Sequence, residues 1–216
     1  MSDVYYRSAI VPSKLSLLKP LCAAALLCAA TAAQAGITVY TSQAGFLAAV
    51  KAPGVDTYDD LTVTPYGETL TRNAGAYTYD AYAATGLYGA GAGGDFWLSN
   101  NTPIAPIVFS NFSGGVSAFG GNFFASDVFG QYTTGKLILT AIDGTALSYG
   151  LAGAATTDFL GFVSTVPLAA VTIATDGGTG VWPTANNVVL AVPEPATYGM
   201  LLAGLGFAGL MSRRRR

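Results

Sequence analysis

The sequence contains no histidine, and only 10% of its 216 residues are charged. Without histidine the chain cannot build a Ser-His-Asp or Cys-His catalytic system, nor the common zinc sites that use imidazole ligands. Its two cysteines, Cys22 and Cys28, both lie in the apolar N-terminal segment. Good helix formers such as Lys, Glu, Gln and Met are scarce. These absences exclude several classes of enzyme and disfavour a helical fold.

Residues 1–35 have the three parts of a secretory signal peptide. A positively charged start precedes a short apolar run, and Ala33-Gln34-Ala35 has the small-x-small pattern of a cleavage site. The apolar run is too short to span a bilayer comfortably. We therefore expect export through the Sec translocon and cleavage after Ala35, with Ala33 and Ala35 marking the site. Both cysteines leave with this segment, so the exported protein is expected to have no thiol and no disulfide.

The segment 192–216 is built from three parts that follow one another to the last residue. Val192 precedes a Pro-Glu-Pro motif, and an uncharged apolar stretch, 196–212, comes next. As a helix this stretch would be about 25 Å long, at the short end of the spanning range. The prolines keep the glutamate in an extended, accessible stretch. We expect a transient inner-membrane helix with a cytoplasmic arginine cluster. The residues of the motif and the cluster are Pro193, Glu194, Pro195, Arg213, Arg214, Arg215 and Arg216.

This tail resembles the PEP-CTERM sorting signal of Gram-negative bacteria. The resemblance implies that an exosortase, a membrane transpeptidase, recognises the Pro-Glu-Pro motif and removes the tail near it. The protein then reaches the cell surface or the exopolysaccharide matrix. The same tail occurs on some ice-binding proteins as the ice-binding protein C-terminal domain, although it carries no ice-binding chemistry itself.

Residues 36–191 form the passenger domain. They carry ten acids and three bases, which gives a net charge of about −7. This charge repels anionic partners, so we expect no nucleic-acid ligand. Many Thr, Gly, Tyr and Phe residues, in short apolar runs separated by turn residues, favour strands. Residues 41–50, 56–61, 116–121 and 158–162, followed by a final strand pair, also resemble a domain type common on PEP-CTERM proteins. This resemblance implies a lectin-like sandwich and brings no established activity.

The expected fold is all-β, an antiparallel two-sheet sandwich of jelly-roll type with one short N-terminal helix. The helix is expected at 42–50, capped by Ser42. Asp143-Gly144 between two alternating runs predicts a hairpin with a type I′ turn. The glycine-rich run 86–94 is expected to be a flexible loop.

A carbohydrate site is the first candidate for binding chemistry. Tyr77 and Tyr79 alternate onto one strand face, and Trp97 follows. If exposed, these rings could stack on sugar rings, with Asn100 and Asn101 nearby to bind hydroxyls. The alternative is that the rings fill the space between sheets, as strand aromatics usually do.

A structural calcium ion is the second candidate, with Asp56, Asp59 and Asp60 as its ligands. The alternative is that each aspartate bonds its own turn. No other metal or cofactor is expected. A glycoside hydrolase would need two carboxylates about 5 to 9 Å apart, and nothing in the sequence marks such a pair.

We therefore expect no enzyme. The expected function is that of an exported protein, sorted by an exosortase, with a structural or adhesive role in exopolysaccharide or biofilm. A carbohydrate-binding module is the first alternative, and a glycoside hydrolase is the second.

Overall fold

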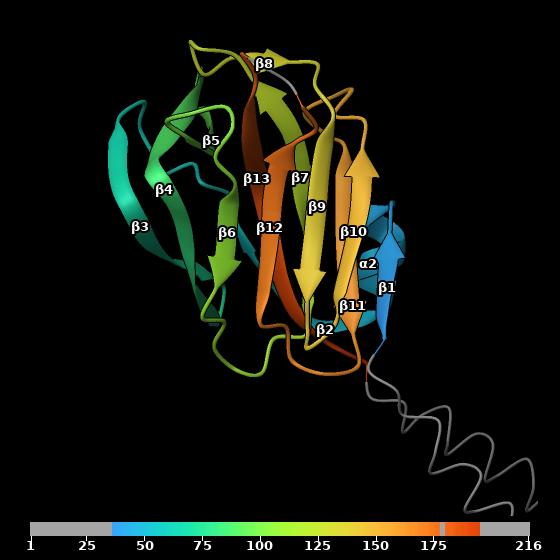
Figure 1. The fold of residues 1–216 in the computed structure, drawn as a ribbon. Helices are drawn as coiled ribbons and strands as arrows, with labels where there is room; N and C mark the ends of the chain where they lie inside the picture. Colours follow the sequence, from blue (N-terminus) through green and yellow to red (C-terminus); the bar gives the residue numbers. More distant parts are fainter. Residues whose placement is uncertain (1–35, 178–179, 195–216) are drawn as a thin grey trace, which may run out of the picture. The chain divides into compact units, whose positions relative to one another are not determined.

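The structure, a computed structural model, describes residues 36–177 and 180–194 (Figure 1). They form thirteen strands and one short helix. In chain order the elements are β1 (Ile37–Tyr40), α2 (Gln43–Ala48), β2 (Val50–Asp56), β3 (Pro65–Ala74), β4 (Tyr77–Ala92), β5 (Asp95–Asn100), β6 (Ile107–Ser110), β7 (Ala118–Ser126), β8 (Tyr132–Thr133), β9 (Leu137–Ile142), β10 (Ala146–Leu151), β11 (Phe159–Ser164), β12 (Ala170–Thr175) and β13 (Trp182–Pro193).

All thirteen strands belong to one antiparallel sheet, which confirms the all-β prediction. The main path runs β1-β11-β7-β13-β5-β4-β6-β12-β9-β10, while β2, β3 and β8 pair with β13, β4 and β7. The sheet curves until it is nearly barrel-shaped (Figure 1). Two separate sheets are not confirmed in the described part of the chain, because β5 joins β13 on one side to β4 on the other.

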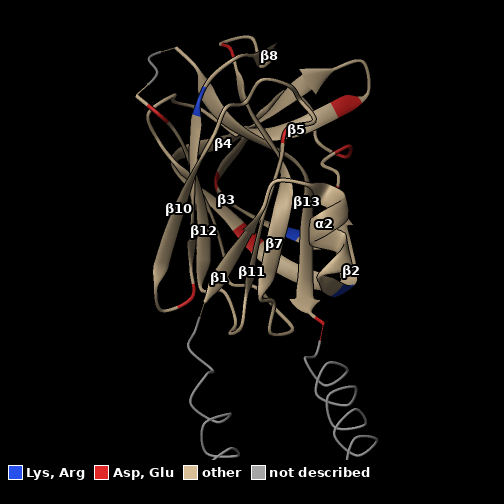
Figure 2. Cartoon of the chain, turned by 90° about the vertical axis from the view of Figure 1, so that its right-hand side faces the viewer, with Lys and Arg blue, Asp and Glu red and all other residues tan. Residues whose placement is uncertain are grey.

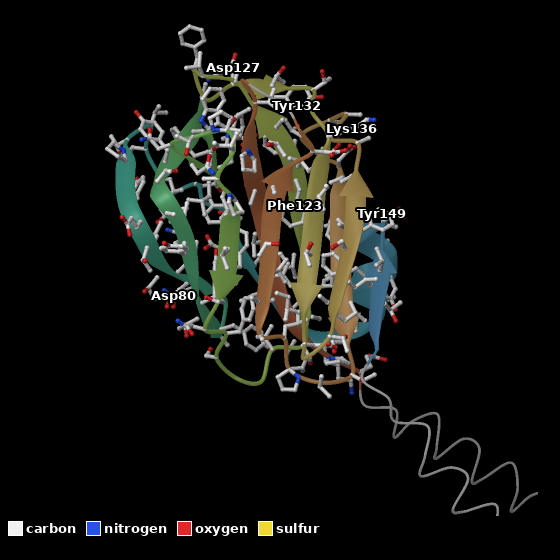
Figure 3. The ribbon with its side chains drawn as sticks, viewed as in Figure 1. Asp80, Phe123, Asp127, Tyr132, Lys136 and Tyr149 are labelled. Atoms are coloured by element: carbon white, nitrogen blue, oxygen red, sulfur yellow. The ribbon has the colours of Figure 1, made fainter. Side chains whose placement is uncertain are left out.

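The inner face of the sheet encloses an aromatic core. Phe109, Phe119 and Phe123 are fully buried, and the ring centroids of Phe119 lie 5.1 Å from Phe109 and 6.0 Å from Phe123. Figure 3 shows Phe123 in the middle of this core. Successive side chains of a strand point to opposite faces, so Leu137 is buried while Ile138 is partly exposed. Burial of this apolar surface is the main stabilising contribution.

A second, smaller apolar cluster covers the outer side of β7, β11 and β13. Phe46 from α2 is fully buried there and packs on Phe159, with ring centroids 5.5 Å apart. The ring needs a residue without a side chain beneath it, because a Cβ at Gly161 would lie 2.4 Å from Phe46 Cδ2. This covering explains why β7 and β13 are buried on both faces.

The helix α2 begins as predicted and ends earlier. The hydroxyl of Ser42 accepts a hydrogen bond from the backbone N–H of Gly45 at 3.5 Å, which caps the first turn. The helix stops at Ala48, because the chain turns there and Val50 already belongs to β2.

The hairpin of β9 and β10 is confirmed, but its predicted turn type is wrong. Three residues, 143–145, connect the paired Ile142 and Ala146. Of these three, only Gly144 has a positive φ, of 107°. The Asp143 carboxylate accepts hydrogen bonds from the N–H and the hydroxyl of Thr145. The side chain therefore closes the turn, which removes the need for two residues with positive φ.

The expectation of a flexible loop at 86–94 is also wrong for most of that run. Residues 86–92 are the second half of β4, which pairs with β5 from Leu87 to Ala92. Its glycines allow close backbone approach: a Cβ at Gly89 would lie 2.1 Å from the carbonyl oxygen of Thr62. The glycines of this run therefore belong to a strand whose backbone lies very close to neighbouring segments.

The strand β13 connects the two ends of the fold. It starts at Trp182, paired with Ser126 at the end of β7 near β8, and it finishes at Pro193. In Figures 1 and 2, β13 finishes at the end of the sheet where β1 starts, and β8 lies at the other end. A regular strand of this length would span about 35 Å. The pairing of β13 is irregular at two places, between Asn186 and Val189 and between Leu190 and Val192. Figure 2 also shows how few charged residues the domain carries.

The one helix formed by residues 36–177 and 180–194, α2, is neither long nor apolar enough to cross a membrane.

Candidate functional site

The three aromatic residues predicted to form a sugar platform are core residues. Tyr77, Tyr79 and Trp97 are all buried. Tyr77 and Tyr79 belong to the main core cluster, and Trp97 packs edge-on against Phe124 at 5.2 Å between ring centroids. An exposed platform at these positions is therefore wrong, since Tyr77 and Tyr79 face the main core and Trp97 is buried in a separate small cluster with Ala90 and Phe124.

The structure brings Asp56 and Asp60 together, but around a cation of the chain itself. The Arg72 guanidinium donates two hydrogen bonds to each carboxylate, at 2.5 to 2.9 Å. The third candidate calcium ligand, Asp59, is not part of these contacts. Among the residues that the structure describes, no group of three or more Asp, Glu, His or Cys side chains could hold a metal ion. Asp56 and Asp60 therefore bind the Arg72 guanidinium, where the calcium hypothesis had placed a metal ion.

Two buried tyrosines extend this ion pair into the core. The Tyr79 hydroxyl donates to Asp56 Oδ2 at 2.7 Å and lies 2.7 Å from the Tyr58 hydroxyl. Burial, reinforced by the charge of Asp56, raises the pKa of both phenols far above the usual range. They therefore stay neutral and keep their hydrogen-bond donors. The hydrogen bonds from Arg72 lower the pKa of Asp60. Every group of this cluster is paired within it, which is typical of a structural network.

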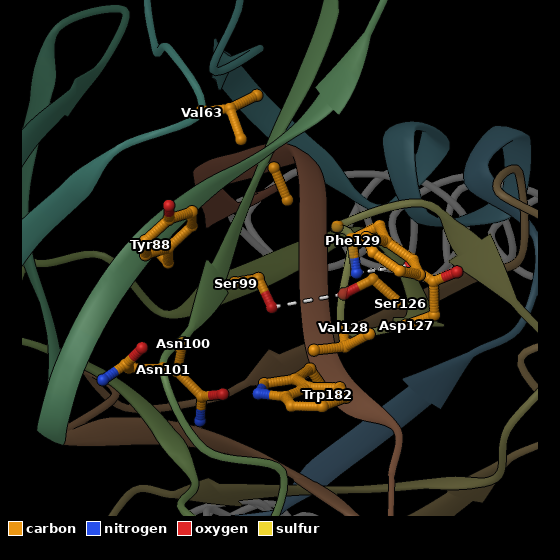
Figure 4. A pocket seen from close by; sticks show the side chains of 12 residues that line it. Val63, Tyr88, Ser99, Asn100, Asn101, Ser126, Asp127, Val128, Phe129 and Trp182 are labelled. Carbon is orange, nitrogen blue, oxygen red and sulfur yellow. Dashed lines mark hydrogen bonds between the residues drawn. The ribbon is translucent and has the colours of Figure 1, made fainter.

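A pocket of about 330 Å³, lined by both polar and apolar side chains, lies at the β8 end of the sheet. Figure 4 shows its lining side chains. Strands β4, β5, β7 and β13 and the loop after β7 supply its walls. The residues that matter for its chemistry are Tyr88, Asn100, Ser126, Asp127, Phe129 and Trp182. The residues lining it include one carboxylate, that of Asp127, and no basic side chain.

Three buried hydroxyl groups lie together at this pocket. The Oγ atoms of Ser99 and Ser126, which both line it, are 3.4 Å apart (dashed in Figure 4). Thr184 completes the group, at 2.9 Å from Ser126 and 3.3 Å from Ser99. The three residues belong to β5, β7 and β13, which are far apart in sequence, so only the pairing of these strands brings the hydroxyl groups together.

The side chain of Asn100 is the least satisfied polar group of the pocket. It is 3% exposed, and its Nδ2 donates to the Ala105 carbonyl oxygen at 2.5 Å. Its Oδ1 has no hydrogen-bond partner within the part of the chain that the structure describes. Native structures leave few buried polar atoms unpaired, so an unpaired one needs an explanation.

The loop 127–131 forms the rim of the pocket and is firmly held. Asp127 Oδ1 accepts hydrogen bonds from the backbone N–H groups of Phe129 and Gln131, each at 2.9 Å. The Gly91 N–H of β4 donates to the Gly130 carbonyl at 3.0 Å. This closed turn presents Val128 and Phe129 to solvent, and Phe129 is 77% exposed.

Sequence reasoning found only part of this pocket. It named Asn100 and Asn101 as hydrogen-bonding neighbours of a sugar, and both line the pocket. It missed the rim loop and Trp182. A usable signal was present in the loop, where two large apolar residues stand between the turn formers Asp127 and Gly130.

The described chain ends inside the predicted sorting motif. Pro193 pairs with Val50 of β2, and the Glu194 N–H donates to the Ala49 carbonyl at 3.2 Å. Glu194 is exposed. The other predicted sorting and cleavage features lie outside the described residues: Pro195, the helix 196–212, Arg213, Arg214, Arg215, Arg216, Ala33 and Ala35.

Comparison with known proteins assigns the C-terminal segment. Residues 191–216 match the family model of the PEP-CTERM protein-sorting motif. No curated protein shows significant similarity to the chain. The chain thus carries a PEP-CTERM motif, as the resemblance implied, and this motif supports exosortase-dependent sorting of an exported protein to the surface. The ice-binding association stays a prediction.

Proposed function

We propose that this protein is a structural or adhesive component of the cell surface or the extracellular polysaccharide, placed there by an exosortase. The observation that carries the proposal is the sorting motif at residues 191–216. The expected partners are the Sec translocon and the exosortase during export, and exopolysaccharide afterwards.

The domain and its sorting signal are directly continuous, which suits a surface module. Residues 191–193 belong both to β13 and to the matched motif, and Glu194 is still attached to the backbone of Ala49. After the exosortase removes the tail, the new C-terminus is therefore joined to the sheet without a long linker. The pocket lies at the other end of β13, beside Trp182.

A carbohydrate-binding module is the second candidate, and the pocket favours it over a glycoside hydrolase. Hydrolysis by the usual mechanism needs two carboxyl groups facing the bond to be cleaved. Asp127 is the one carboxylate among the residues that line the pocket, and its Oδ1 is engaged in the turn. We therefore propose binding without catalysis.

The sorting claim predicts the behaviour of a double variant, Glu194→Gln with Pro195→Ala. Both changes alter the motif, while the Glu194 backbone hydrogen bond to Ala49 is kept. We expect the unprocessed protein to accumulate in the membrane fraction and surface exposure to be lost. Gel mobility and protease accessibility on intact cells measure the two effects.

The matched control is Glu68→Gln, which removes one exposed acid from β3 and should leave processing unchanged. Normal processing of the double variant would contradict recognition through Glu194 and Pro195.

A further inference from the structure

We infer that the pocket at the β8 end is a binding site for a neutral saccharide. The inference rests on the proposed function, because it names the chemical class of ligand that an adhesive surface module would bind. It concerns residues other than Tyr77, Tyr79 and Trp97, which are buried.

The polar side of the pocket suits hydroxyl groups. Asn100 Oδ1 is an acceptor without a partner in the described chain, and the Trp182 indole lies beside this carboxamide in Figure 4. Ser99 and Ser126 add hydroxyls that can either donate or accept. A ligand hydroxyl that donates to Asn100 would satisfy the unpaired oxygen, a larger gain than adding a bond between groups already paired.

Aromatic and apolar side chains make up most of the rest of the pocket lining. Tyr88 and Trp182 line the pocket, and Phe129 and Val128 stand on its rim. A pocket that combines aromatic walls with a few convergent polar groups is the usual form of a small-molecule site, and about 330 Å³ is at the lower end of its size range. A sugar ring offers both surfaces that this arrangement needs, apolar C–H groups on its faces and hydroxyls around its edge.

Charge argues for a neutral ligand. The residues lining the pocket include no basic side chain to pair with an anion, and the domain as a whole has a net charge of about −7. An acidic sugar or a phosphate would meet the Asp127 carboxylate without a compensating cation.

The rim is ordered before any ligand arrives. The bonds from Phe129 and Gln131 to Asp127, and from Gly91 to Gly130, hold the turn that carries the exposed apolar pair. A Cβ at Gly130 would lie 3.0 Å from the Cβ of Ala90, so the loop packs closely on β4. Such preorganisation reduces the entropy cost of binding.

The location of the pocket also suits the inference. In Figure 3, Asp127 marks the end of the sheet opposite to the one where β1 starts. Since β13 leads from Trp182 to Pro193, the pocket faces away from the segment that the exosortase acts on.

The test is a titration of the full chain in a zwitterionic detergent, because glycoside detergents would compete for the site. Trp97→Phe leaves Trp182 as the only tryptophan, so fluorescence then reports on the pocket. The probes are glucose, galactose, mannose, N-acetylglucosamine and dextran. We expect a saturable change in Trp182 fluorescence with at least one probe, at a Kd on the order of 1 mM.

Two variants locate the site, with calorimetry as the readout and circular dichroism as the check on folding. Phe129→Ser should weaken binding about tenfold without affecting the fold, because this side chain is exposed. Trp182→Ala should abolish it. Tyr149→Ser on β10, also partly exposed but far from the pocket in Figure 3, should have no effect.

No saturable response to any of the five probes up to about 10 mM would overturn the saccharide site. Binding that survives both Phe129→Ser and Trp182→Ala would overturn it too, since the ligand would then bind elsewhere. Either result would leave the sorting experiment untouched, so failure of this inference is distinguishable from failure of the proposed function.

Discussion

Replacement of Arg72 by leucine is expected to lower the free energy of unfolding by about 3 to 5 kcal/mol. Arg72 neutralises Asp56, which is 4% exposed and also accepts a hydrogen bond from Tyr79. Without the guanidinium a buried carboxylate would lose its counter-charge and two of its hydrogen bonds. Urea denaturation followed by circular dichroism measures the loss as a shift of the midpoint.

Two further variants separate the buried charge from the exposed one. Asp60, which is 68% exposed, pairs with the same guanidinium, and Asp60→Asn should cost less than about 1 kcal/mol. Adding Asp56→Asn to Arg72→Leu should recover part of the stability, because the unpaired charge is then gone. Equal losses for Arg72→Leu and Asp60→Asn would contradict a network centred on the buried pair.

Gly54→Ala is expected to destabilise the fold by about 3 kcal/mol. A Cβ at Gly54 would lie 2.0 Å from the carbonyl oxygen of Ala74, and neither backbone can move without disturbing β2 or β3. Gly150→Ala in β10 is the matched control, since a Cβ there meets no atom within 4 Å. It should be neutral or slightly stabilising. The same urea titration compares the two, and a Gly54→Ala protein as stable as the Gly150→Ala protein would show that the contact is not tight.

Features with local causes could be predicted from the sequence. Ser42 caps the helix through a residue three positions away, and Asp143-Gly144 forms its turn from adjacent residues. The C-terminal motif is likewise a linear pattern, which the match at residues 191–216 bears out. A composition rich in strand-forming residues was enough to predict the all-β fold.

Features that depend on strand pairing could not be predicted. Alternation places Tyr77 and Tyr79 on one face of β4, but only the curvature of the sheet decides that this face is the inner one. Arg72 of β3 binds Asp56 of β2, and no sequence motif links these two positions. The pocket brings Asn100 to Trp182, more than eighty positions later, through the path β5-β13.

The central claim, exosortase-dependent sorting, is tested most directly by the intact mass of the protein in cells with and without their exosortase. With the enzyme, we expect a surface protein that has lost the signal peptide and the arginine tail, with its C-terminus near Pro193 to Pro195. Without the enzyme, we expect the chain to keep residues up to Arg216 and to remain with the membrane fraction. An identical C-terminus and location in both kinds of cell would contradict the claim.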